Sequence, residues 1–304
     1  MREAIVASAI AVVTRAWPLI EGLEKKIRMT QITVDVPASL KASLERVAEE
    51  TGQTCCAIVT AALSRHLEVP IHTLFQVSTS GALVAGVYSG AVTVKTILDH
   101  GDFGLGTFAD LDGEMVVLDG RVYQVQGSGR VSEAPPQARA PFAVVTHLTP
   151  QVDAEIETIA DFADLEKHCD SFRTSGNIFY ALRVEGRFDR VLARAVNPVR
   201  AGGLVDAAKK QSEFHFTDIV GTLVGLWSPG FTSAFSVPGY HFHFLSADLL
   251  HGGHLLDCSA GTLHLQMDAL TEFHLALPEN ESFLKADLSK TTADELAYAE
   301  KAHD

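Results

Sequence analysis

The segment Gly239–Phe244 (Gly-Tyr-His-Phe-His-Phe) constrains the fold more than any other part of the chain. Side chains alternate between the two faces of a β-strand, so His241 and His243 point to one face and the phenylalanines to the other. Gly252-Gly253-His254 follows, and a strand returning after this turn would bring a third histidine to the same face. Three neutral imidazoles with one open coordination position are the ligand set of a catalytic zinc ion. The segment therefore predicts a metal site built on β-strands.

The third ligand of this site has an alternative. His251 lies in the same interval and competes with His254 for the role. If His254 lies on the returning strand, His251 falls in the turn and is solvated. The chain contains 13 histidines, and any single one is more often structural than a ligand. We expect His264 and His274 to lie at the surface or to pack against other side chains. The metal prediction therefore depends on the combination of the His-Phe-His strand with Gly-Gly-His, and not on any single histidine.

Short apolar or alternating runs with Gly and Pro turns recur after residue 72, and they predict a sheet-dominated fold with few helices. Helices are expected at residues 92–100 and 153–172. Because 47% of the 304 residues are apolar, the chain can bury a substantial core. We predict an α+β, β-rich domain of mixed and antiparallel sheets. The expected strands cover residues 115–118, 121–125, 178–184, 190–196, 221–227, 240–245, 254–259 and 262–267.

The N-terminal region follows a different pattern. Residues 32–36 alternate like a strand and end at Pro37. Apolar residues then recur at helical spacing until Gly52, a typical residue at the end of a helix, and Thr54 is a plausible N-cap for a second helix. Residues 29–68 thus resemble the ribbon-helix-helix module of small dimeric repressors.

DNA binding by this module is disfavoured. In the module the outward residues of the strand read the major groove, and here one such set is Gln31, Thr33 and Asp35. An acidic residue in this position and a net charge of −14 oppose binding to phosphates. We therefore expect residues 29–70 to be a dimerisation element, in preference to a DNA-binding module, and residues 71–304 to form the main domain.

Residues 1–28 form an extension of unclear status. The apolar run at residues 4–13 has about the length of a signal-peptide core, but no clear cleavage site follows it. Met29 is an alternative start, and the run is shorter than the about 20 apolar residues that span a bilayer. The four cysteines form no CxxC pair. Reduced thiols and a cytoplasmic location without membrane contact are expected, with secretion as the alternative.

A glycine-rich segment, residues 101–106, precedes Thr107 and a Leu-Asp-Gly run that ends at Glu114. Segments of this kind often hold phosphate, but this one lacks the Lys-Ser/Thr of a P-loop and the GxGxxG spacing. The alternative is a tight turn whose backbone passes close to a ligand or another strand. Glu114 follows a turn and begins a strand, which predicts that its carboxylate projects toward the metal.

Arginines supply a possible substrate clamp. Residues 186–189 are expected to form a hairpin-like turn, and on the strand that follows Arg190, Leu192 and Arg194 share one face. A guanidinium group held in a pocket binds a carboxylate through two parallel hydrogen bonds. The alternative is a solvated face of ion pairs.

Taken together, these residues resemble the α-acetolactate decarboxylase family. The resemblance covers about residues 72–302 in order and does not include residues 1–70. The matching segments are HGDFGLGTFADLDGEM (100–115), PFAVVTHL (141–148), NIFYALRVEGRFDRVLARAV (177–196), GTLVGLWSP (221–229) and GYHFHFLSADLLHGGHLLD (239–257).

The resemblance implies roles for individual residues and a homodimer. His241, His243 and His254 match the zinc ligands. The remaining site residues implied by the family are Arg194 as the active-site arginine, Glu114 as the first carboxylate, Thr107 as a residue lining the pocket, and Glu300, with Glu295 as its neighbour, as the second carboxylate.

The implied reaction is the decarboxylation of 2-acetolactate to acetoin and CO2, a step of acetoin and butanediol synthesis. Zinc would chelate the ketone and hydroxyl oxygens of the substrate and stabilise the enediolate that forms as CO2 departs. Two other classes stay open: a cupin-like metal-dependent oxygenase that uses the same histidine face, and a regulator that senses acetolactate and uses the N-terminal module.

Overall fold

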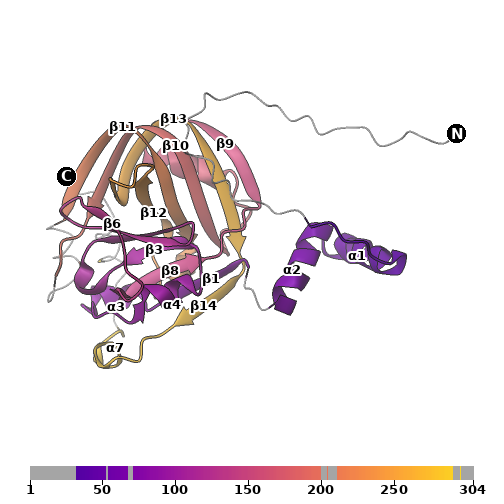
Figure 1. Ribbon diagram of the computed structural model, residues 1–304, viewed down its shortest axis with the longest axis horizontal. Coiled ribbons are helices and arrows are strands. Elements are labelled where there is room, and N and C mark those ends of the chain that lie inside the picture. The colour runs from indigo at the N-terminus through magenta and orange to yellow at the C-terminus, as the bar shows by residue number, and fades with distance from the viewer. Residues whose placement is uncertain are drawn as a thin grey trace. The chain divides into compact units, whose positions relative to one another are not determined.

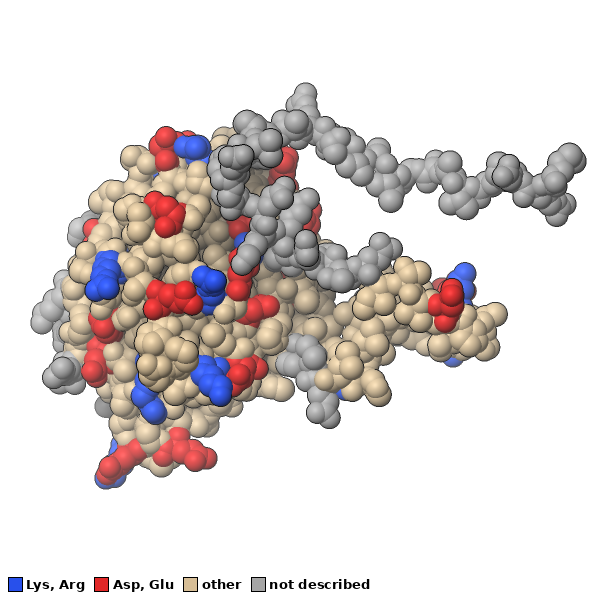
Figure 2. All heavy atoms as spheres, in the orientation of Figure 1, with Lys and Arg blue, Asp and Glu red and all other residues tan. Residues whose placement is uncertain are grey.

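A computed structural model describes residues 32–52, 54–67, 71–199, 204, 211–289 and 295 (Figure 1). The chain divides into two compact units, with the division between Val59 and Thr60. Among the described residues, no helix has the length and apolar character needed to cross a membrane. On the face seen in Figure 2, acidic and basic side chains are interspersed over the larger unit.

The N-terminal region contains the two expected helices, α1 (Ala38–Thr51) and α2 (Cys55–Leu67). Gly52 ends α1 in the left-handed conformation, with φ 68°, as its position predicts. The expected strand at residues 32–36 is wrong for the single chain, because these residues form no regular secondary structure and pair with no described strand. A strand is stabilised by its ladder partner, which alternation in the sequence does not supply. The ribbon-helix-helix resemblance is therefore not confirmed.

The main unit contains a seven-stranded sheet in the order β14-β1-β8-β3-β4-β5-β6. It is mixed, because β1 pairs with β14 in parallel and all its other pairs are antiparallel. Its strands are β1 (Thr73–Val77), β3 (Phe103–Thr107), β4 (Glu114–Leu118), β5 (Arg121–Val125), β6 (Val131–Glu133), β8 (Phe142–Thr146) and β14 (Glu272–Ala276). The shorter elements near it are α3 (Ser80–Val84), β2 (Val92–Thr93), α4 (Val94–Leu98), η1 (Ala109–Leu111), β7 (Arg139–Ala140) and α7 (Glu281–Lys285).

The second sheet is antiparallel, in the order β10-β11-β12-β13-β9. Because β10 also pairs with β13, the strands from β10 to β13 close on themselves. Aromatic and aliphatic side chains such as Phe188, Phe242 and Phe244 form a core on one face, and Leu165 of α5 packs into it. The elements are β9 (Val152–Ile159), α5 (Phe162–Asp170), β10 (Phe179–Ala195), β11 (Ser212–Ser228), η2 (Gly230–Thr232), β12 (Gly239–Ser246) and β13 (Gly252–Leu270).

The two sheets meet where β11 and β12 contact β3 and β4 (Figure 1). A cross-sheet ion pair joins them: the buried Arg183 of β10 donates to Asp119, in the turn between β4 and β5, at 2.7 Å. Arg183 also donates to Glu185 at 2.6 Å, so its charge is compensated. This contact holds the strands that border the functional site in place.

The fold class is confirmed, but three local expectations are wrong. Residues 153–159 form strand β9 and not a helix, because Val152, Ala154 and Ile156 alternate with acidic residues at the period of a strand. The hairpin-like turn at residues 186–189 lies within β10, where shifts in register replace the turn. Likewise the strands expected at residues 254–259 and 262–267 form the single strand β13.

The glycine-rich segment is also different from a phosphate loop. Residues 103–107 form β3, in the interior of the seven-stranded sheet. A Cβ atom on Gly104 would lie 2.1 Å from the Val144 carbonyl oxygen, and one on Gly106 would lie 2.5 Å from that of Phe142. The glycines are needed because β3 passes close to β8, which is the alternative that the sequence left open.

We expect Gly104→Ala to lower the free energy of unfolding by about 2–4 kcal/mol, because backbone atoms of β8 must move to admit the methyl group. Gly176→Ala is the matched control, since nothing lies within 4 Å of its added Cβ; its effect should stay within about 0.5 kcal/mol. Urea unfolding measures both. Equal stabilities of the two variants would contradict the close approach of β3 and β8.

Candidate metal centre

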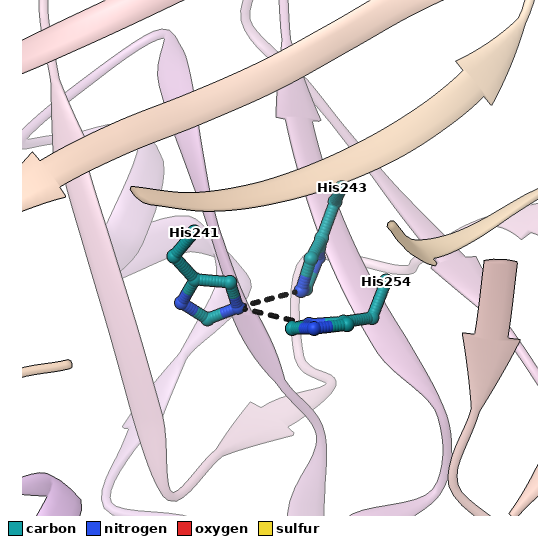
Figure 3. A group of neighbouring side chains, drawn as sticks. All are labelled: His241, His243 and His254. Atoms are coloured by element: carbon teal, nitrogen blue, oxygen red, sulfur yellow. Dashed lines mark hydrogen bonds between the residues drawn. The ribbon is translucent and has the colours of Figure 1, made fainter. Parts of the chain in front are cut away.

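Three imidazoles converge on one another, as Figure 3 shows, on strands of the five-stranded sheet. His241 and His243 come from β12, and His254 comes from β13, directly opposite His243 in the antiparallel register. The Nε2 atom of His241 lies 3.2 Å from Nε2 of His243 and 3.1 Å from Nδ1 of His254. His243 and His254 are buried, and His241 is partly buried. Strand alternation and register thus bring the three predicted histidines together.

The geometry of this cluster fits a small tetrahedral metal. Two nitrogen ligands of a zinc ion, each about 2.0–2.1 Å from it, lie about 3.3 Å apart in a tetrahedral arrangement. Burial and the charge of Arg194 lower the pKa of His241 to about 3. Burial, with His241 nearby, also lowers the pKa of His243 well below its usual value. Both imidazoles are therefore neutral at pH 7, which is the state that binds metals.

The orientation of His243 is set from the other sheet. Its Nδ1–H donates to the backbone carbonyl of Met115 in β4, at 2.8 Å. A carbonyl oxygen can only accept, so Nδ1 carries the proton and the lone pair of Nε2 faces the other imidazoles. Hydrogen bonds of this kind orient metal-binding histidines in general. Sequence analysis did not find Met115, because a backbone acceptor leaves no mark in the sequence.

Arg194 places a positive charge beside the histidines. It lies opposite His254 in the pairing of β10 with β13, so both side chains project from one face. The side chain is 4% exposed and its Nη1 donates to Gln211 at 2.9 Å. The side chain of Arg190, four residues earlier on the same strand, is 42% exposed and forms an ion pair with Asp257 at 2.8 Å. The structure thus buries Arg194 and leaves Arg190 partly exposed, although the two residues alternate with core residues on the same strand, as the sequence predicts.

The seven-stranded sheet contributes Glu114 and Thr107, which are opposite each other in the pairing of β3 with β4. Both are buried and line the same pocket as the histidines and Arg194. Glu114 Oε2 lies 3.6 Å from His243 Nε2. The hydroxyl of Thr107 donates to the Gly113 carbonyl at 2.8 Å, so Thr107 also holds the turn before Glu114.

Other histidines and the C-terminal carboxylate lie elsewhere. His251 is exposed in the turn between β12 and β13, with its ring 5.0 Å from that of Phe216. His264 is at the surface and binds Asp153 at 2.7 Å. Glu300 lies outside the described residues. Several further residues line the pocket, and the sequence does not reveal them because none carries a charged or metal-binding group: Ser80, Leu83, Leu111, Phe142, Val196, Leu204 and Val237.

Residues 74–290 match the family model described as alpha-acetolactate decarboxylase. The chain belongs to this family. Alpha-acetolactate decarboxylase from Methylococcus capsulatus is 41% identical over 231 residues, which cover 75% of this chain and 89% of that protein. The enzyme from Brevibacillus brevis is 37% identical over 234 residues, covering 76% and 82%.

The fold agrees with that of a solved family member. The crystal structure of alpha-acetolactate decarboxylase from Bacillus subtilis strain 168 superposes with a TM-score of 0.74 at 33% identity. The superposition covers 76% of this chain and 100% of the other. The family resemblance drawn from the sequence is therefore confirmed for the main unit, and the N-terminal region lies outside the matched range.

We expect His243→Ala to lose bound metal, because it removes one of three nitrogen donors and the link to Met115. His251→Ala, an exposed histidine of the adjoining turn, should retain the metal content of the parent protein. Elemental analysis of both purified variants measures this. Undiminished metal in His243→Ala would show that the ion binds elsewhere.

Proposed function

We propose that this protein decarboxylates 2-acetolactate to acetoin and CO2, with a zinc ion held by His241, His243 and His254. The observation that carries the proposal is a buried cluster of three imidazoles with a buried guanidinium on the same sheet face, in a chain of this family. A cation site beside a fixed positive charge suits a substrate that carries a carboxylate next to polar oxygens.

The three imidazoles would hold zinc, because all three are nitrogen donors whose ligand atoms lie close together and all three line the pocket. When bound, the ion supplies a Lewis acid for the negative charge that develops on the substrate as CO2 leaves. The protein contributes orientation: the bond from His243 to Met115 and the strand register hold the donors before the metal arrives.

Arg194 binds the substrate carboxylate in this proposal. Its guanidinium is buried, so the charge is screened little by water, and Gln211 holds one of its nitrogens. Planar, bidentate contact with a carboxylate fixes the bond to be broken relative to the ketone. Orientation of this kind aligns that bond with the carbonyl that receives its electrons.

The proton balance assigns a role to Glu114. The bond between the carboxylate and the hydroxyl-bearing carbon breaks, CO2 leaves, and the electron pair passes into the ketone. One proton must then reach the carbon that lost CO2, which yields acetoin. Glu114 is a buried carboxyl group in the pocket, next to the imidazoles, and is placed to deliver it. We assign Thr107 to the pocket wall and Glu300, which lies outside the described residues, as the second carboxylate.

We also propose that the enzyme is a cytoplasmic homodimer in which residues 29–70 form a dimerisation element separate from the main domain. Support comes from apolar side chains that are exposed along this region, among them Ile32, Val34 and Leu40. Apolar surface of this kind marks contact sites. Light scattering of the full chain and of Val34→Asp should give two protomers for the first and a lower mass for the second.

The activity is tested by acetoin release from 2-acetolactate, with metal content measured on the same sample. We expect activity with bound zinc, loss of activity after treatment with a chelator, and recovery when zinc is added back. Protein that holds stoichiometric zinc and leaves acetolactate unchanged would refute the proposal. Bound iron with O2 uptake on a keto acid would favour an oxygenase instead.

Arg194→Lys should lower kcat/KM for acetolactate by about 100-fold or more, because a lysine cannot reproduce two parallel hydrogen bonds. Arg190→Lys is the control, since this residue lies on the same strand but is partly exposed and paired with Asp257. Its kcat/KM should change by less than about twofold, as for a surface ion pair. Similar losses in both variants would remove Arg194 from the binding of substrate.

A further inference from the structure

The four arginines of β10 meet two kinds of hydrogen-bond acceptor. Arg183, Arg187 and Arg190 each have a guanidinium nitrogen 2.7–2.8 Å from an aspartate oxygen. The fourth, Arg194, lines the pocket and donates from Nη1 to the side-chain oxygen of Gln211 at 2.9 Å. The acceptor at this nitrogen of Arg194 is thus a neutral amide.

The amide of Gln211 has a defined orientation. This residue directly precedes β11, and its Nε2 donates to Oε1 of Glu213 at 3.3 Å. A guanidinium group can only donate and an ionised carboxylate can only accept, so the amide oxygen faces Arg194 and the amide nitrogen faces Glu213. Because both ends are bound, a flip of the amide would break two hydrogen bonds. Gln211 is therefore an acceptor held in one orientation.

The strand register makes this arrangement informative. Glu213 is the residue directly opposite Arg194 in the pairing of β10 with β11, and oppositely charged residues in such positions commonly pair with each other. Here Gln211 bridges the two, since it accepts from one and donates to the other. Glu213 is exposed and Arg194 is 4% exposed. The negative charge thus lies at the exposed end of the bridge and the amide oxygen at the buried end.

The type of acceptor matters for an arginine that binds a substrate. A carboxylate of the protein on the guanidinium would offset the positive charge that attracts an anionic ligand. An amide oxygen accepts the hydrogen bond and brings no negative charge. Water screens charges weakly at a buried site, so this difference is larger in the pocket than at the surface. Gln211 can therefore orient the guanidinium and leave the pocket attractive to anions.

We propose that Gln211 is a positioning residue for Arg194: it holds Nη1 with a neutral acceptor and so preserves the attraction of the guanidinium for the carboxylate of the substrate. The proposal rests on the proposed function, in which Arg194 binds that carboxylate. Gln211 acts through Arg194 and contacts neither the substrate nor the metal in this role.

Two substitutions separate a neutral acceptor from a merely structural one. Gln211→Glu keeps the length and the acceptor oxygen but adds a negative charge, and kcat/KM for 2-acetolactate should fall at least about tenfold. Gln211→Met keeps the length and removes the acceptor, and a fall of about two- to tenfold is expected from the loss of one hydrogen bond. If Gln211 only held Arg194 in place, glutamate would serve as well as glutamine and methionine would be the more harmful residue. That order of activities would overturn the proposal.

Two further variants control for charge. Gln137→Glu adds the same charge at an exposed position outside the pocket, and kcat/KM should change by less than about twofold. The exchange of Gln211→Glu with Glu213→Gln in one protein keeps the net charge and places the carboxylate on Arg194. This double variant should lose activity as Gln211→Glu does. Parental activity in the double variant would show that the acceptor at Arg194 is not what matters. Zinc content and the unfolding temperature establish that each variant is folded.

A binding measurement separates this proposal from the proposed function. Two analogues that cannot decarboxylate by this route differ in charge alone: 2,3-dihydroxy-2-methylbutanoate and its carboxamide. Calorimetry with zinc-loaded protein should find that Gln211→Glu binds the carboxylate at least about tenfold more weakly than the parent does. Binding of the neutral carboxamide should change by less than about threefold. Equal losses for both analogues would indicate a general distortion of the pocket and would overturn the proposal.

The two proposals fail in different ways. If Gln211→Glu loses the carboxylate selectively while no form of the protein releases acetoin, the decarboxylase assignment is wrong and the role of Gln211 is supported. If the parent releases acetoin and Gln211→Glu binds the carboxylate as tightly as the parent does, the role of Gln211 is wrong and the decarboxylase assignment is unaffected.

Discussion

The functional site depends on the register in which three strands pair. His243 lies directly opposite His254 across β12 and β13, and His254 lies directly opposite Arg194 across β13 and β10. Directly opposed residues in antiparallel strands project from the same face, so this row puts donors and positive charge side by side. A slip of one residue on β13 would turn His254 into the aromatic core behind the sheet. The aromatic residues of that core, Phe242 and Phe244 among them, therefore protect the metal site by making such a slip costly.

The seven-stranded sheet completes the site that the histidines of the five-stranded sheet begin. The carbonyl of Met115 orients His243, and Glu114, its neighbour in β4, brings a carboxyl group into the same pocket. The bond from Arg183 to Asp119 holds the far end of β4 against the five-stranded sheet. A displacement of β4 would thus disturb the imidazole cluster and the Glu114 carboxyl group together. The charge of the buried Arg183 is compensated there by Asp119 and Glu185, which are both partly exposed to solvent.

Much of the site was predictable from the sequence, because its reactive side chains alternate with apolar residues at the period of a β-strand. The alternation of His241 and His243 follows from geometry that any strand obeys. The choice between His254 and His251 stayed open in the residue pattern, and the family resemblance favoured His254. The predictions of secondary structure were wrong where the local sequence pattern and the pairing of distant strands indicate different structures. Residues 32–36 alternate like a strand but find no partner among the described residues, and the turn expected at residues 186–189 is absorbed into β10 by shifts in register. Pairing of this kind depends on chain segments far apart in sequence, which periodicity does not report.

Residue identity and the alternation of side chains along a strand are local properties of the chain, so the candidate donor residues, the face that they share and the family could be predicted from the sequence. The burial of Arg194 beside the imidazoles, with Arg190 paired at the surface, depends on the tertiary structure. It also decided that a backbone carbonyl orients His243, and that Leu111 enters the pocket from a strained turn. The burial of the arginine, the hydrogen bond to His243 and the position of Leu111 depend on how the two sheets pack and on backbone angles that neighbouring segments impose. Burial, backbone acceptors and strain arise between segments, so no single stretch of sequence contains them.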